Sequence, residues 1–137
     1  MTSDLQAYLQ KFAEKSFIRG LSDCCALAAG WIEVCTGKPV VHPGLGRPLT
    51  DAEAAAVVGD HGGSVGKIAR KVLNEAGWMM REGEPEDGDI IIAERSQSCF
   101  PCFLGIWSKG HLVTTSRHGM RMVSRIDRLE MEVWHGN

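Results

Sequence analysis

The sequence lacks an excess of either charge and any apolar run long enough to cross a bilayer. Fifteen Lys and Arg against 17 Asp and Glu give a net charge of -2, without a basic block or an acidic tail. Binding of nucleic acid through a charged face is therefore disfavoured. The longest apolar runs, such as 54–58 and 90–93, are far shorter than the ~20 residues of a membrane-spanning helix. The first ten residues show no secretion-signal pattern, so we expect synthesis in the cytoplasm without membrane insertion.

A disulfide framework is not expected either. The chain has five cysteines, an odd number, and without a secretion signal the reducing default is free thiols, a metal site or a catalytic thiol. Hydrophobic residues make up 44% and charged residues 23% of the sequence, which is ordinary for a folded protein. At 137 residues the chain is expected to form one domain, over 1–137.

Apolar residues at helical spacing predict four helices before residue 77. Asp23 is placed to cap the second helix and Gly37 to end it. Thr50 and Glu53 have capping-box spacing at the start of the third, and Ser64 is expected as the cap of the fourth. The helices are expected over 4–15, 24–36, 51–58 and 64–76.

After residue 77 the apolar runs become short and are separated by turn-like segments, which predicts a meander of antiparallel strands. The runs are WMM (78–80), DIIIAE (89–94), CFLGIW (102–107), HLVTT (111–115), MRMV (120–123) and MEVW (131–134). Helices first and strands second predict an α+β domain, with N-terminal helices packed on a C-terminal antiparallel sheet.

Cys24 is the candidate nucleophile. It falls in the first turn of the second helix, where unpaired amides and the helix dipole favour a thiolate over a thiol. Cys25 is displaced by roughly 100° around the helix, so only one of the pair can point into a given cleft. The alternative is that both cysteines are simply buried as small apolar side chains, which is the commoner situation for a cysteine.

Three segments together resemble the NlpC-type cell-wall cysteine peptidases and their papain-like relatives: FIRGLSDCCALAAGWIEVCTGKP, EPEDGDIIIAE and FLGIWSKGHLV. In that family an Asp-Cys dipeptide opens a helix, a Gly-Asp precedes the first strand and a Gly-Ile-aromatic strand follows. The sequence is most similar to a phage- and prophage-encoded branch of undefined activity. The matching positions are Asp23, Cys24, Trp31, Thr36, Gly37, Gly88 and Asp89.

The resemblance implies an NlpC/papain-like fold in which the Cys24 thiolate attacks a peptide carbonyl of peptidoglycan and a strand histidine transfers the proton. In the family this histidine stands two residues before the strand glycine, and here Phe103 occupies that position. Loss of the general acid and base costs a factor of roughly 10² to 10⁴ in rate. We therefore expect no peptidase activity, unless His111 at the start of the next strand serves as the base.

Cys99 and Cys102 form a C-x-x-C spacing, which suits zinc, an iron-sulfur cluster or redox chemistry when a second pair accompanies it. No second pair is clear from the sequence, and a simple turn explains the spacing equally well. No other cofactor is expected.

The resemblance leads to the hypothesis of a phage or prophage tail protein with a degenerate NlpC-like fold. Such a protein would serve as a structural or assembly component near the tail tip, bound to other tail proteins and present in the virion tail after synthesis in the host cytoplasm. One alternative is an active cysteine peptidase or amidase that cleaves peptidoglycan peptides during genome entry. Another is a small metal-binding interaction module that uses Cys99 and Cys102.

Overall fold

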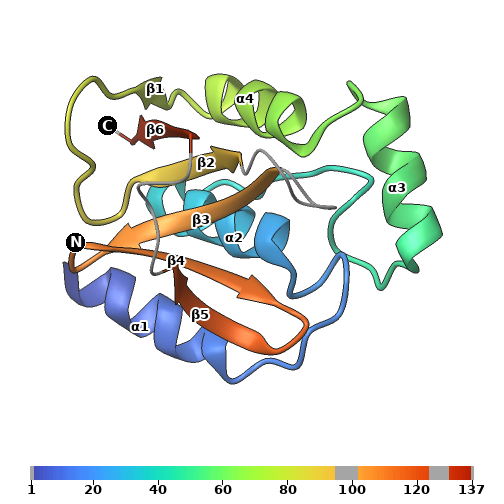
Figure 1. The fold of residues 1–137 in the computed structure, drawn as a ribbon, viewed down its shortest axis with the longest axis horizontal. Helices are drawn as coiled ribbons and strands as arrows, with labels where there is room; N and C mark the ends of the chain where they lie inside the picture. Colours follow the sequence, from blue (N-terminus) through green and yellow to red (C-terminus); the bar gives the residue numbers. More distant parts are fainter. Residues whose placement is uncertain (1, 95–101, 124–129, 137) are drawn as a thin grey trace.

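Four helices followed by a six-stranded antiparallel sheet make up the computed structural model, which describes residues 2–94, 102–123 and 130–136 (Figure 1). The α+β arrangement predicted from the sequence is confirmed. None of the helices in the described ranges has both the length and the hydropathy of a membrane span. The elements are α1 (Thr2–Ala13), α2 (Cys24–Thr36), α3 (Asp51–Asp60), α4 (Val65–Glu75), β1 (Met79–Met80), β2 (Ile90–Glu94), β3 (Cys102–Ser108), β4 (His111–Ser116), β5 (Gly119–Val123) and β6 (Glu130–His135).

Local signals set the bounds of α2 as predicted. One carboxylate oxygen of Asp23 accepts a hydrogen bond from the amide of Ala26 at 2.9 Å, which is the capping bond of the first turn. At the other end Gly37 adopts a left-handed conformation (φ 73°), and its amide bonds to the carbonyl of Glu33. Helix α2 therefore begins at Cys24 and ends at Thr36.

Side-chain caps also fix the starts of α3 and α4. Thr50 and Glu53 form the reciprocal capping box, and α3 continues to Asp60, two residues beyond the predicted end. Ser64 accepts a hydrogen bond from the amide of Lys67 at 3.2 Å, which confirms its role as the cap of α4. Helix α1 begins and ends two residues earlier than predicted.

The strand order corrects the prediction of a simple meander. It is β1-β6-β2-β3-β4-β5, so the C-terminal strand β6 lies between β1 and β2 and pairs with both. Strand β2 is thus central, and its residues 90–93 are all buried. A strand that is covered on both faces needs a hydrogen-bonding neighbour along each edge. Strand β1 has only two residues and is too short to pair along the whole of β2, so β6 takes this place.

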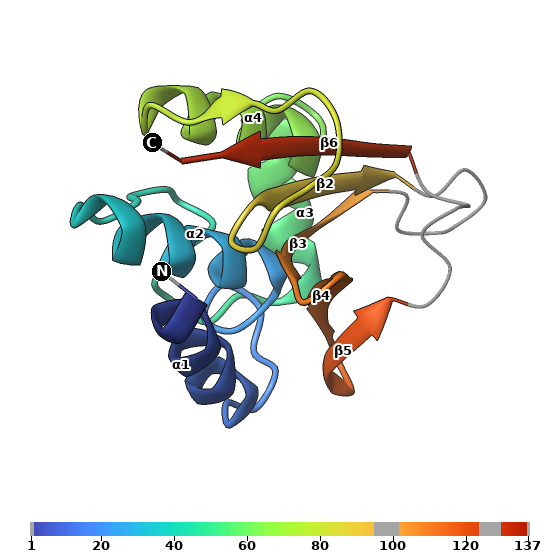
Figure 2. The same ribbon diagram turned by 90° about the vertical axis from the view of Figure 1, so that its left-hand side faces the viewer.

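The two faces of the sheet carry separate apolar clusters. Helices α1 and α2 lie on one side of the sheet (Figure 2), where Trp31 and Leu27 of α2 pack with Leu104 and Ile106 of β3. The opposite face carries a second cluster: Ile91, Ala93, Trp107, Leu112, Val123 and Val133. The candidate site lies on the first face, where the start of α2 meets β3.

Gly105 allows β4 to cross closely over β3. Strand β4 pairs with β3 only from His111 to Val113, and beyond that the hydroxyl of Thr114 donates to the carbonyl of Leu104 at 2.6 Å. A Cβ atom at position 105 would lie 2.6 Å from the carbonyl oxygen of Val113, which is closer than any real side chain approaches. The close approach of two backbones explains the glycine in this strand.

Gly105→Ala is therefore expected to lower the free energy of unfolding by about 1–3 kcal/mol, because backbone must shift to admit the methyl group. Gly59→Ala is the matched control, since a Cβ there meets no atom within 4 Å and the residue lies inside α3. The control should be neutral or gain up to about 1 kcal/mol. Urea unfolding of both variants checks this, and equal effects would contradict it.

Candidate active site

Cys24 lies in the first turn of α2, half-buried, against the backbone of β3. The capping carboxylate of Asp23 holds this turn in place by accepting hydrogen bonds from Gly20 and Ala26, each at 2.9 Å. The amide of Leu104 in β3 hydrogen-bonds to the Cys24 sulfur. The predicted placement of this thiol at a helix start that faces the sheet is thus confirmed.

The surroundings of Cys24 favour its ionised form. A hydrogen bond from the thiol of Cys25 is the largest influence and lowers the pKa of Cys24. The amide of Leu104 and the charge of Arg19 act in the same direction, while burial and the Asp23 carboxylate oppose them. A thiolate held by a donor and a backbone amide at a helix start is a competent nucleophile.

Cys25 has the opposite character. Its proton is held in the hydrogen bond to Cys24, and this bond together with burial raises the pKa of Cys25. Cys25, and not Cys24, lines a pocket of about 530 Å³. The expectation that only one of the pair would point into a given cleft is confirmed, and the one in the pocket is the weaker acid.

His111 lies far from Cys24. It begins β4 and pairs with Ser108 at the end of β3, whereas Cys24 contacts β3 at Leu104. Four residues along a strand correspond to ~13 Å. The imidazole is exposed, and its Nδ1 lies 3.0 Å from the carbonyl of Lys109. The structure does not bring the candidate base and the candidate nucleophile together.

Phe103 lies on the face of the sheet opposite Cys24. Its side chain packs with the cluster on that face, while its neighbours Cys102 and Leu104 lie on the face that the helices cover. That Phe103 stands at the position of the family's histidine stays a prediction from the resemblance. The run CFLGIW is apolar on both faces and does not indicate which of its residues face the helices.

The other histidines have different neighbours. The rings of His42 and His61 meet edge to face with their centroids 5.0 Å apart, and the Nδ1 of His42 accepts a hydrogen bond from Gly44 at 3.0 Å. His118 lies exposed in the β4–β5 turn, and His135 lies at the end of β6. The residues that shift the pKa of Cys24 most are Cys25, Leu104, Asp23 and Arg19, and none of them is a histidine.

Of the C-x-x-C pair, the structure describes Cys102. Cys99 lies outside the described residues, and Cys102 begins β3 beside the amide of Gly66 in α4. Burial raises the pKa of Cys102, which disfavours the thiolate that a metal would bind. Within 2–94, 102–123 and 130–136, no three His, Cys, Asp or Glu side chains are grouped to hold a metal ion.

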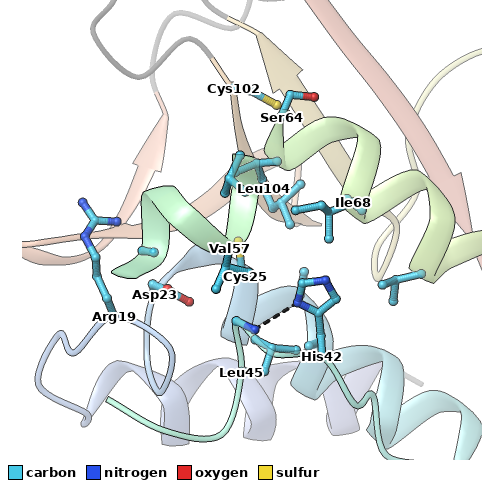
Figure 3. A pocket seen from close by; sticks show the side chains of 18 of the residues that line it. Arg19, Asp23, Cys25, His42, Leu45, Val57, Ser64, Ile68, Cys102 and Leu104 are labelled. Carbon is cyan, nitrogen blue, oxygen red and sulfur yellow. Dashed lines mark hydrogen bonds between the residues drawn. The ribbon is translucent and has the colours of Figure 1, made fainter. Parts of the chain in front are cut away.

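The pocket beside Cys25 has a volume of about 530 Å³ and lies among α2, α3, α4 and the loop 38–49 (Figure 3). Ile90 of β2 and Leu104 of β3 form part of its wall. The sequence did not predict this pocket. The apolar residues of α3 predict a helix, but they do not indicate whether that helix packs against the core or stands away from it.

The remaining positions that carried the family resemblance have structural roles. The indole of Trp31 donates to the carbonyl of Gly88 at 2.8 Å, so α2 is tied to the turn before β2. Asp89 is 3% exposed and pairs with Arg81 at 2.6 Å. The hydroxyl of Thr36 donates to the carbonyl of Ile32 at 2.9 Å in the last turn of α2.

The chain belongs to a family described as a domain of unknown function, DUF6950, whose model matches residues 1–132. No curated protein and no solved structure matches it.

Cys25→Ala is expected to raise the pKa of Cys24 toward the usual range of a thiol, because it removes the hydrogen bond that lowers this pKa most. Cys35→Ala on the same helix is the control: burial and then Asp4 raise the pKa of Cys35 to about 11, and it has no part in the pair. The pH dependence of Cys24 alkylation, followed by mass spectrometry, measures the shift. An unchanged midpoint in Cys25→Ala would contradict the paired arrangement.

Proposed function

We propose that this protein is a structural or assembly component of a phage or prophage tail, near the tail tip, with an NlpC-like fold that lacks peptidase activity. The order of helices and sheet, and the placement of Cys24 where a helix start meets a strand, support the fold. The tail assignment rests on the resemblance of the Asp23-Cys24 helix start and the Gly88-Asp89 turn to the phage-encoded branch.

The observation that carries the inactive assignment is the set of groups around the Cys24 sulfur. They are a thiol, a backbone amide, a carboxylate and a guanidinium. A thiolate can attack an amide carbonyl, but the leaving amine must be protonated before it departs. Without an imidazole the tetrahedral intermediate returns to reactants, because the thiolate is the better leaving group.

The structural roles of the matched positions agree with this proposal. Asp23, Trp31 and Asp89 hold α2 against the sheet through the capping bonds, the Gly88 contact and the ion pair with Arg81. These interactions would persist in a protein that keeps the scaffold for assembly after the chemistry is lost. The partners we propose are other tail proteins, with synthesis in the host cytoplasm and final location in the virion tail.

An active cysteine peptidase or amidase is the second candidate, and one observation favours it. The pKa of Cys24 is lowered, and the Leu104 amide beside its sulfur is the type of donor that stabilises an oxyanion. Such an enzyme would cleave peptidoglycan peptides and would need its proton donor from the substrate or from a partner. The metal-binding alternative gains no support from Cys102, and Cys99 is not described.

Complementation separates the two functions. Deletion of the gene from the phage or prophage that encodes it should abolish complete tails in electron micrographs, and both the wild-type chain and Cys24→Ala should restore them. Cys35→Ala controls for loss of a thiol elsewhere in α2. Normal tails without the chain would refute the tail assignment. Failure of a folded Cys24→Ala variant to restore tails would refute the inactive assignment.

In a direct assay, the purified chain is expected to release no products from peptidoglycan or from its stem peptides, because the amine leaving group has no imidazole of the described residues beside it, and the Cys25 thiol, whose pKa is raised, is a poor acid. Liquid chromatography with mass spectrometry of the digests measures this. Turnover that disappears in Cys24→Ala would contradict the proposal and establish the peptidase.

A further inference from the structure

Helix α3 covers the pocket without packing into the core. None of its residues is buried, and Ala54, Val57 and Val58 on its inner face are half-exposed and line the pocket (Figure 3). An apolar helix face normally packs against other side chains. Here it faces a cavity of about 530 Å³, which lies within the range of small-molecule sites.

Polar contacts at its two ends hold α3 in this position. At the start, Asp51 forms an ion pair with Arg19 of the preceding loop at 2.5 Å and another with Arg117 of the β4–β5 turn. At the end, His61 contacts the ring of His42. Exposed ion pairs each contribute little to stability, so the two ion pairs of Asp51 hold α3 only weakly.

The polar side chains that line the pocket are already paired within the protein. Asp23 accepts two backbone amides, Ser64 accepts the amide of Lys67 and His42 accepts the amide of Gly44. Arg19 and Asp51 neutralise each other. Burial and the neighbouring His61 and Lys71 lower the pKa of His42, so its imidazole is uncharged at neutral pH. The hydrogen-bonding capacity of these groups is thus largely used within the protein. Within the described ranges, Asp23 is the charged group of this set whose carboxylate is held by two backbone amides and is not neutralised by an ion pair.

Apart from the thiols of Cys25 and Cys102, the rest of the wall is mainly apolar, and its extent suits a chain rather than a compact group. Lining residues run along α2 from Cys25 to Ile32 and along α4 from Val65 to Leu73. Seven and eight residues of helix correspond to ~10 to 12 Å each. Both helices begin near α3 (Figure 1), so the lining residues follow α2 and α4 away from α3. The part of the pocket that these residues line is here called the slot.

We propose that this pocket binds an unbranched hydrocarbon chain, such as the acyl chain of a fatty acid or a lysolipid, with α3 as its lid. The chain would fill the slot between α2 and α4 and would contact the inner face of α3. This binding site is independent of the chemistry of Cys24, because the Cys24 side chain does not line the pocket.

Binding of the neutral dye N-phenyl-1-naphthylamine to the full chain tests the proposal. The dye should show saturable fluorescence enhancement at one site, and decanol, decanoate or decanoyl lysophosphatidylcholine, below their aggregation concentrations, should displace it. The compound that displaces it most strongly identifies the source of the chain as an alcohol, a free acid or a lipid. Absence of saturable binding, or displacement by none of the three, would overturn the proposal.

Two alanines of α3 provide a matched pair of variants. Ala54→Trp fills the pocket from its lid, whereas Ala56→Trp places the same side chain on the exposed side. We expect Ala54→Trp to weaken dye binding at least about tenfold and Ala56→Trp to leave it within about twofold. Should Ala54→Trp lose its helical circular dichroism, Val58→Phe replaces it. Equal affinities in the lining and exposed variants would refute the pocket as the site.

Discussion

The Asp23 carboxylate is the constraint on which the site depends. One oxygen caps α2 through Ala26 and the other holds the approaching loop through Gly20. Together they fix the register at which α2 begins, and thereby place Cys24 against Leu104 and Cys25 against the pocket. If α2 began one residue later, both sulfurs would be rotated by roughly 100° about the helix axis. Cys24 would then no longer face Leu104, and Cys25 would no longer line the pocket.

The scaffold and the chemistry are separable in this protein. Trp31, Gly88 and Asp89 make interactions that position α2 on the sheet and involve no reacting group. Cys24 has surroundings that favour a thiolate, whereas His111 lies at the far end of β3. His42 lines the pocket that Cys25 also lines, and its ring meets that of His61.

Features that depend on neighbouring residues, such as helix bounds, could be predicted from the sequence, whereas features that depend on contacts between distant residues, such as strand order, could not. Asp23, Gly37 and Ser64 act on their own neighbours, so the bounds of α2 and the cap of α4 followed from their positions. The insertion of β6 between β1 and β2 depends on pairing between residues that lie 36 to 56 positions apart in the sequence. The face of Phe103 could not be predicted because β3 is apolar on both sides. His111 lies far from Cys24 because it pairs with Ser108, which is four residues, or ~13 Å, along β3 from Leu104.

The central claim is that Cys24 is a nucleophile without a general acid. It is tested most directly by the intact mass of the protein after exposure to one acyl group presented either as an activated phenyl ester or as an amide. The phenolate departs without protonation and the amine does not. The account predicts acylation of Cys24 by the ester, absent in Cys24→Ala, and no product from the amide. Cleavage of the amide, or an unreactive Cys24 with the ester, would contradict it.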